Sequence, residues 1–399
     1  MPDLTFYNQL TMESRRWPVL HQRLKWARRF FGKRLPGIGA DIVRAVAPAT
    51  TFRIGAPKGS FSIHQSLLGE ECRPARVILT DQGSPQAGPE SMMVRSNSRQ
   101  HLCQPWPVFW SRHHHARLVT SSLALLDAQK RLCRESVYND FAMEDDPAWR
   151  YFVLPKATEL AGNWTSIISR WCPNFEPPTF THWILDALPR LAMLQDFPAD
   201  TGILVPERLA GYQKETLKLL GLLDRVRHTP ERHLIVQNYF FAAPTAMIDC
   251  YNPFGVNFLR DQFLPKADPT YSGPKKFLIH RNKKSRGIVN ETEVYDFFRE
   301  RGWEIVDTEK LTFAQEIKLF NDADAISGIF GSGFTNIIWC RPGCKVLPFV
   351  ADQWIDGYVE WLAQAVGAKF QYRIFPSDHA IRAHIDLDAV KEMLRTDDL

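Results

Sequence analysis

The chain has 399 residues, of which 45% are hydrophobic and 23% are charged. This balance is ordinary for a folded globular protein and argues against a disordered chain. The net charge of +5 fits anionic small molecules or an anionic surface as partners. The sequence has none of the motifs of nucleic-acid-binding modules, so no nucleic-acid partner is expected.

The cysteines and the lengths of the apolar runs indicate the compartment in which the protein works. Seven cysteines are scattered without a Cys-x-x-Cys pair, which favours free thiols. No run reaches the roughly 18 apolar residues of a membrane span, and the N-terminus lacks a signal-peptide core, so we expect a cytoplasmic protein. Residues 20–35 combine six Lys and Arg with Leu, Trp and Phe. They predict either a helix lying peripherally on the inner membrane face or a helix packed on its own protein.

In the first half of the chain, an arm precedes alternating strands and helices. Residues 1–70 are expected to form a basic arm that is interrupted by Gly and Pro, and a short strand is expected at 76–80. Further on, the pattern predicts a helix at 180–194, a strand at 202–205, a helix at 212–220 and a strand at 234–241. This alternation favours βα units and a parallel sheet. Prolines and glycines at 265–274 mark a boundary, which gives domains at 1–70, 71–268 and 269–399.

The second half shows a more regular alternation. It predicts strands at 276–280, 303–306, 323–327, 345–350 and 370–375, with helices at 290–300, 312–323 and 357–366. Asn290 with Glu293, and Thr312 with Gln315, have the spacing of capping boxes. The order of elements is typical of a Rossmann-like unit.

The glycine-rich stretch GIFGSGFTN, residues 328–336, lies at the expected junction between a strand and a helix. Glycines permit close approach of another group, and a helix N-terminus offers N–H groups to a phosphate. The pattern is neither the GxGxxG of dinucleotide-binding turns nor a P-loop. A tight turn that merely packs the strand on the helix explains the stretch equally well.

Polar side chains share one face of the helix predicted at 180–194. His182, Asp186 and Arg190 recur at every fourth position, while Ile184, Leu188 and Leu191 lie opposite. A carboxylate four residues from a histidine can orient its ring and raise its basicity, as a general base requires. A solvated polar face with a local ion pair is the alternative, and Pro189 should kink or end the helix.

Basic residues follow the strand predicted at 276–280. Arg281, Lys283, Lys284 and Arg286 occupy a loop where a doubly wound sheet holds a diphosphate, although a solvated basic loop has the same composition. Asp322 and Asp324 have the spacing of a metal-binding DxD motif, but they straddle the end of a predicted helix. We therefore expect no metal there.

Taken in order, three blocks resemble glycosyltransferase family 61: HWILDALPRL at 182–191, Arg281-x4-Arg286-x3-Asn290-Glu291, and the glycine-rich stretch with its Thr335-Asn336. The resemblance covers roughly residues 165–350. It implies an α/β fold of the GT-B type, with two Rossmann-like domains facing across a cleft behind an N-terminal extension. It also implies inversion at the anomeric carbon without a bound metal.

The resemblance and the motifs together assign the site. His182 or Asp186 is expected to act as the catalytic base, and Trp183 and Arg190 are expected on the acceptor side. We expect a hexosyl- or pentosyltransferase that uses a nucleotide-sugar, uridine-linked, as substrate, without a cofactor, and a glycan or lipid-linked acceptor. The expected donor-binding residues are Arg281, Arg286, Asn290, Glu291, Gly331, Ser332, Gly333, Thr335 and Asn336.

The chain departs from the family pattern at several positions. Phe330 stands where the family usually has a histidine, Ser332 replaces an alanine and Phe334 a leucine. Either the donor is held differently or activity is reduced, so a catalytically impaired, glycan- or nucleotide-sugar-binding member of a polysaccharide assembly system is the alternative function. An oxidoreductase on the same type of sheet is a third hypothesis, against which the missing GxGxxG counts.

Overall fold

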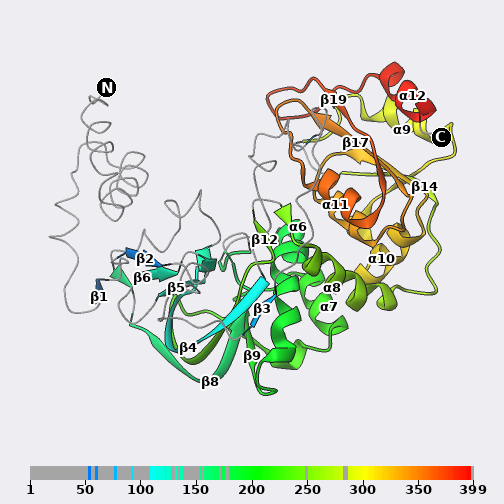
Figure 1. Ribbon diagram of the computed structural model, residues 1–399. Coiled ribbons are helices and arrows are strands. Elements are labelled where there is room, and N and C mark those ends of the chain that lie inside the picture. The colour runs from blue at the N-terminus through cyan, green and yellow to red at the C-terminus, as the bar shows by residue number, and fades with distance from the viewer. Residues whose placement is uncertain are drawn as a thin grey trace, which may run out of the picture.

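The computed structural model describes two lobes of mixed α/β structure (Figure 1). Most of the arm at 1–70, including the basic segment 20–35, lies outside the described residues, as do Lys283 and Lys284. Among the described residues, no helix is both long and apolar enough to cross a bilayer. The described residues are 53–54, 59–61, 76–78, 92, 108–121, 123–126, 131–133, 135–137, 153–154, 156–169, 172–175, 179–247, 250–281 and 286–396.

The first lobe is built on a mixed sheet with the strand order β10-β9-β8-β11-β4-β5-β6-β2, in which β3 also pairs with β4. Strands β8 to β11 run parallel to one another, but β4 pairs antiparallel with each of its partners, β11, β3 and β5. The parallel sheet predicted for this half is therefore only partly correct. The strands are β2 (Gly59–Phe61), β3 (Arg76–Ile78), β4 (Val108–Val119), β5 (Ala124–Leu126), β6 (Arg131–Cys133), β8 (Thr158–Ser166), β9 (Gly202–Pro206), β10 (Val226–Thr229) and β11 (His233–Ala242).

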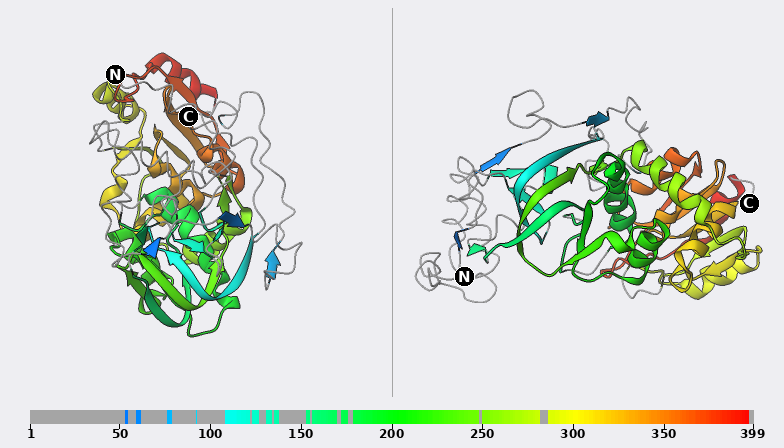
Figure 2. Two further views of the ribbon diagram at one scale, coloured as in Figure 1. Left: turned by 90° about the vertical axis from the view of Figure 1, so that its left-hand side faces the viewer. Right: turned by 90° about the horizontal axis from the view of Figure 1, so that it is seen from below.

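The predicted helix at 180–194 exists, but it is irregular. It begins as α6 (Phe180–His182), widens into the π-helix η6 (Trp183–Ala187) and continues as the 3-10 helix η7 (Leu188–Asp196). Pro189 explains this change, because its ring lacks an N–H donor and crowds the preceding turn. Two regular helices, α7 (Gly211–Leu219) and α8 (Pro253–Phe263), lie between the first sheet and the second lobe (Figures 1 and 2).

The second lobe contains a parallel sheet with the order β15-β14-β16-β17-β18, and β19 pairs with β17. The chain moves outward from β14 to β15 and then returns to the other side of β14 through β16. The carboxyl ends of β14 and β16 thus form a topological switch point, where open α/β sheets bind ligands. The elements are β14 (Lys276–Ile279), α9 (Glu291–Arg299), β15 (Glu304–Val306), α10 (Phe313–Asp322), β16 (Ala325–Ile329), η11 (Ser332–Trp339), β17 (Lys345–Ala351), α11 (Tyr358–Val366), β18 (Lys369–Phe370), β19 (Arg373–Phe375) and α12 (Leu387–Thr396).

Most elements predicted for the second half are confirmed, with three corrections. The capping box at Thr312 is present, but the Asn290 side chain makes no capping hydrogen bond. The strand predicted at 370–375 is divided into β18 and β19, and the helix that follows the glycines is a 3-10 helix. Helix α12 was not expected from the sequence pattern.

An apolar cluster joins the two lobes. Phe313 at the start of α10 packs edge-on against Phe180, Phe263 and Trp339. The Glu215 side chain of α7 accepts a hydrogen bond from the Phe313 backbone N–H at 3.0 Å. The lobes therefore share one core. The domain boundary predicted at residue 268 stays a prediction.

Candidate active site

The three glycines of the stretch 328–333 leave room for the end of strand β14 to pack closely against them. A Cβ at Gly328, whose φ is +139°, would lie 2.9 Å from the backbone oxygen of Ile279, and a Cβ at Gly333 would lie 3.1 Å from the Ile279 side chain. A Cβ at Gly331 would lie only 1.7 Å from Nη1 of Arg281. The bare backbone of the loop is thus matched to the strand end that carries Arg281, as close approach requires.

Arg281 brings a cationic group to this edge of the sheet. Its Nη1 donates to the Phe330 oxygen at 3.3 Å, whereas its Nε is buried without a hydrogen-bond partner. Burial, and then the charge of Arg286, lowers the pKa of Arg281. Among the described residues, no carboxylate lies within ion-pair distance of either guanidinium. Two neighbouring cations, one with a buried unused donor, form an arrangement suited to a multiply charged anion.

The Tyr295 hydroxyl stabilises the backbone from which the Arg281 side chain extends. It donates to Oε1 of Glu291 at 2.8 Å and lies 2.6 Å from Nδ1 of His280, the residue before Arg281. Because the hydroxyl has one proton, which it gives to Glu291, His280 must donate from Nδ1. Glu291, a predicted donor-binding residue, thus acts on the strand end that carries Arg281 through Tyr295 and His280.

The opposite side of the glycine loop is closed by aromatic residues. The Tyr358 hydroxyl at the start of α11 donates to the Gly331 oxygen at 3.0 Å. The Phe330 ring is buried and packs edge-on against Tyr358, with ring centroids 5.5 Å apart. Ser332 and Gly333 remain partly exposed at the first turn of η11. Their backbone N–H groups lie at the positive end of this helix, where an anion is favoured.

A histidine–aspartate pair lies next to this loop on the first lobe. Nδ1 of His182 and Oδ2 of Asp186 are 2.5 Å apart, as the spacing of four residues predicts. Asp186 is buried and its second oxygen, Oδ1, has no hydrogen-bond partner. The Thr181 hydroxyl accepts from the Thr335 hydroxyl at 2.9 Å, so the start of α6 touches η11. The structure therefore brings the pair to the loop.

Three of the predicted site residues are engaged within the protein. Thr335 and Asn336 are buried, and the Asn336 amide donates to Glu316 at 3.0 Å. Burial, opposed by this hydrogen bond, raises the pKa of Glu316 to about 8. Nδ2 of Asn290 donates to the Ile385 oxygen, and Oδ1 of Asn290 accepts from the Ile385 N–H, both at 2.9 Å. These two hydrogen bonds anchor the segment before α12. The side chains of Thr335, Asn336 and Asn290 thus have structural partners.

The acceptor-side expectation for Trp183 and Arg190 needs a correction. Trp183 is fully buried, and its Nε1 donates to Thr216 at 2.9 Å. Arg190 is 4% exposed and donates to the oxygens of Ala242 and Ile168, at 2.9 and 3.1 Å. Trp183 thus anchors the irregular helix to α7, and Arg190 anchors it to the end of β11.

Other residues were missed by the sequence analysis. Tyr295 and Tyr358 have apolar neighbours and look like core residues in the sequence. Their hydroxyl groups can be recognised as parts of the site only from their contacts with His280, next to Arg281, and with Gly331. The position of Tyr295 one turn after Glu291 was the one available signal, because residues four apart share a helix face.

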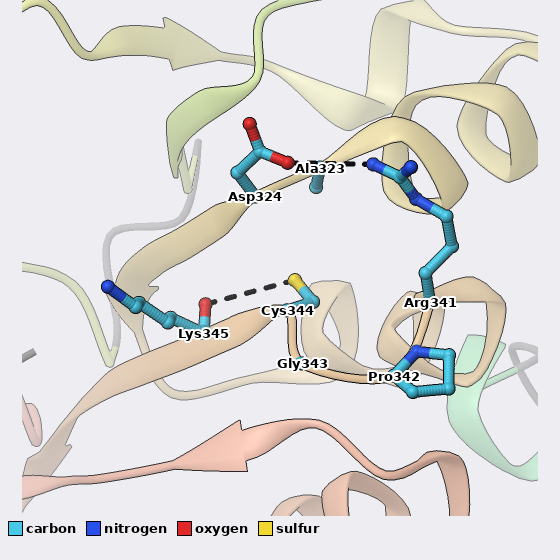
Figure 3. A pocket seen from close by; sticks show the side chains of 7 residues that line it. All are labelled: Ala323, Asp324, Arg341, Pro342, Gly343, Cys344 and Lys345. Atoms are coloured by element: carbon cyan, nitrogen blue, oxygen red, sulfur yellow. Dashed lines mark hydrogen bonds and ion pairs between the residues drawn. The ribbon is translucent and has the colours of Figure 1, made fainter.

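Asp322 and Asp324 lie at the opposite edge of the parallel sheet. Asp322 pairs with Lys318 at 2.7 Å, and Asp324 pairs with Arg341 at 3.5 Å. Asp324 and Arg341 line a hollow of about 400 Å³ together with Pro342 to Lys345 (Figure 3). This hollow is at the amino ends of β16 and β17, away from the glycine loop. Among the described residues, no cluster of His, Cys, Asp and Glu could hold a metal ion.

Comparison with known proteins gives one family. The model of the family described as Glycosyltransferase 61 matches residues 180–347. The match begins at α6 and ends in β17, so it includes His182, Arg281 and the glycine loop. The resemblance predicted from the three motifs is thereby confirmed. A search of curated proteins finds no match to the chain.

Proposed function

Because residues 180–347 match glycosyltransferase family 61, we propose that this protein transfers a sugar from a nucleotide donor to a glycan acceptor, with inversion and without a metal. The observation that carries the proposal is the position of the Arg281 guanidinium. Its guanidinium lies against Gly331 at the switch point of the parallel sheet, with a buried Nε that lacks a protein partner. A diphosphate is a ligand that satisfies this donor.

On the donor side, the reaction needs stabilisation of a departing nucleoside diphosphate. The bond between the anomeric carbon and the phosphate oxygen breaks, and the electron pair leaves with the diphosphate. The positive charges of Arg281 and Arg286 stabilise the negative charge that develops on the diphosphate. The N–H groups of Ser332 and Gly333 donate hydrogen bonds to it. These cations take the part that a divalent ion has in metal-dependent transferases.

On the acceptor side, the reaction needs a base for the hydroxyl proton. Asp186 accepts from Nδ1 of His182, which leaves Nε2 as the nitrogen that takes the proton. The acceptor oxygen then forms its bond to the anomeric carbon from the side opposite the departing diphosphate, which inverts the configuration. The His182 side chain is 21% exposed, which allows such contact.

Several finer features belong to the same proposal. The two lobes correspond to a GT-B arrangement, with the donor on the second lobe and the acceptor approaching from the first. The donor is uridine-linked and carries a hexose or a pentose, and the acceptor is a growing polysaccharide or a lipid-linked glycan. Such a reaction takes place in the cytoplasm, where residues 20–35 would hold the protein at the membrane surface.

A catalytically impaired binding protein is the second candidate, and the Phe330 ring favours it. This ring is buried against Tyr358 and offers the ligand no polar atom in a loop where the family usually has a histidine. Such a protein would bind the nucleotide-sugar or the glycan without turnover. Calorimetry with UDP and an assay of donor hydrolysis separate the two functions.

The direct test is a thermal-shift screen with a panel of nucleotide-sugars. A ligand at 100 times its dissociation constant stabilises the fold by about 2.7 kcal/mol, which is readily measured. Arg281→Ala should abolish both the shift and turnover. Arg341→Ala, which removes the same charge at the far edge of the sheet, is the matched control and should keep both. An Arg281→Ala variant with normal turnover would contradict the proposal.

A further inference from the structure

An exposed aromatic ring lies at the same edge of the second sheet. Trp354 is 43% exposed, and among the described residues only Leu223 and Val289 are other large hydrophobic side chains with comparable exposure. Trp354 follows the carboxyl end of β17, which pairs with β16. The connection continues to Tyr358, whose hydroxyl binds the Gly331 oxygen. The exposed indole is therefore on a loop tied to the candidate donor site.

The loop that carries Trp354 is fixed by its neighbours on both sides. Asp352 accepts hydrogen bonds from the backbone N–H and the hydroxyl of Ser377. The Gln353 amide donates to the oxygens of Ser377 and Asp378, at 3.0 and 3.1 Å. The Trp354 N–H closes a turn on the Ala351 oxygen. The exposure of the ring thus results from a defined backbone position.

Arg286 connects this ring to the cationic part of the site. Its guanidinium carbon lies 5.1 Å from the centroid of the Trp354 ring. Its backbone has a φ of +56°, which is uncommon for a residue with a side chain, and its N–H donates to the Ala380 oxygen at 3.0 Å. Such conformations are maintained where the surroundings require them, often at ligand sites. The positive charge of Arg286 also acts on Arg281.

We infer that Trp354, with Arg286 beside it, is the stacking surface for the nucleobase of the donor, while Arg281 and the glycine loop hold its diphosphate. This inference rests on the proposed function. It follows from the order of the groups around the edge of the sheet. Arg281 lies against Gly331, Arg286 is next to Arg281, and Trp354 lies beside Arg286. Tyr358, which follows Trp354 in the chain, binds Gly331 again. A nucleoside diphosphate has the same order, with charge at one end and a flat aromatic ring at the other.

Physical chemistry favours a base over the other parts of the donor. A base has a π face that stacks on an indole, and the contact tolerates any base. The guanidinium next to the ring adds a planar cation, which also stacks on aromatic rings. The contact supplies affinity without selecting the sugar, so it would act equally on a nucleoside diphosphate with or without its sugar.

The test compares Trp354→Ala, Trp354→Phe and the control Leu223→Ala, which removes another exposed apolar side chain from the first lobe. Binding of UDP, GDP, CDP and ADP, of the corresponding nucleotide-sugars, and of inorganic pyrophosphate is measured by calorimetry. The strongest nucleotide should bind Trp354→Ala at least tenfold more weakly, since stacking of one base contributes roughly that much. Pyrophosphate affinity should change less than about twofold, and both Trp354→Phe and Leu223→Ala should bind nearly as the wild type does.

Other outcomes overturn the inference in distinguishable ways. Unchanged nucleotide affinity in Trp354→Ala, with binding lost in Arg281→Ala, would refute the stacking role and leave the proposed function intact. An equal loss for nucleotide and pyrophosphate would show that Trp354 only supports the loop. A loss for the nucleotide-sugar but not for the nucleotide would assign the ring to the sugar. A wild type that binds neither nucleotides nor pyrophosphate would refute the proposed function together with the inference.

Discussion

Replacing Gly331 with alanine should impair function without unfolding the protein. The added Cβ would lie 1.7 Å from Nη1 of Arg281, and the two atoms must separate to at least 3.0 Å. The Arg281 side chain can yield because the clash is at its flexible end. The φ of Gly331 is 170°, an extended value that alanine adopts without strain. The free energy of unfolding should therefore change by less than about 1 kcal/mol, as for alanine at a compatible position.

The displacement of Arg281 should nevertheless reduce catalysis strongly. A misplacement of about 1 Å at a reacting group can cost roughly 100-fold in rate. Removal of one charge-stabilising donor costs roughly 100- to 1,000-fold in kcat. We therefore expect Gly331→Ala to lower kcat at least about 100-fold and to weaken binding of UDP. The assays are donor hydrolysis, calorimetry with UDP and thermal unfolding of the same preparations.

Two other glycines serve as controls for Gly331. A Cβ at Gly328 would press on the backbone oxygen of Ile279, which cannot yield, and its φ of +139° strains any other residue. Gly328→Ala should thus lose more than about 1 kcal/mol of stability. Gly211 has no atom near its Cβ position, so Gly211→Ala should leave activity unchanged. Normal donor affinity and turnover in Gly331→Ala would refute the role of Arg281 in holding the donor diphosphate.

Three further predictions follow from other contacts. His182→Ala and Asp186→Asn should each lower kcat roughly 100- to 10,000-fold and leave the affinity for UDP unchanged, because only the base is lost. Tyr295→Phe removes the hydroxyl that binds His280, the residue before Arg281, so it should weaken UDP binding and lower stability by about 1 kcal/mol. Glu316, with its pKa raised from 4.5 to about 8, favours the neutral acid in the folded state. Its contribution to stability is therefore complete below pH 4.5 and is lost as the pH rises towards 8. For one group, the free energy of unfolding falls by at most about 1.4 kcal/mol per pH unit over this range. Glu316→Gln should remove this part of the decline.

Each of these predictions has an opposite outcome that counts against it. Loss of UDP affinity in His182→Ala would place that side chain on the donor side. A Tyr295→Phe variant with wild-type UDP binding would mean that Arg281 keeps its position without the hydroxyl. Identical pH profiles of thermal unfolding for the wild type and Glu316→Gln would show that the carboxyl does not titrate between pH 5 and 8.

The sequence by itself determined the local elements of the second half and the chemistry offered to the site. Alternation of apolar residues, the capping box at Thr312 and the glycine that ends α9 act over a few neighbouring positions, so they can be read from the chain. The spacing of four residues between His182 and Asp186 likewise determined their contact, because it is set by one helical turn.

Tertiary structure decided which of these groups face one another. The order of strands in the second sheet places Arg281 against Gly331, 50 residues later in the chain, and no local signal carries that information. The same holds for Arg190, whose position on a polar stripe predicted exposure. Its guanidinium instead binds the oxygen of Ala242, 52 residues away, beneath the first sheet. Burial depends on what packs over a side chain, and the covering residues come from distant parts of the sequence.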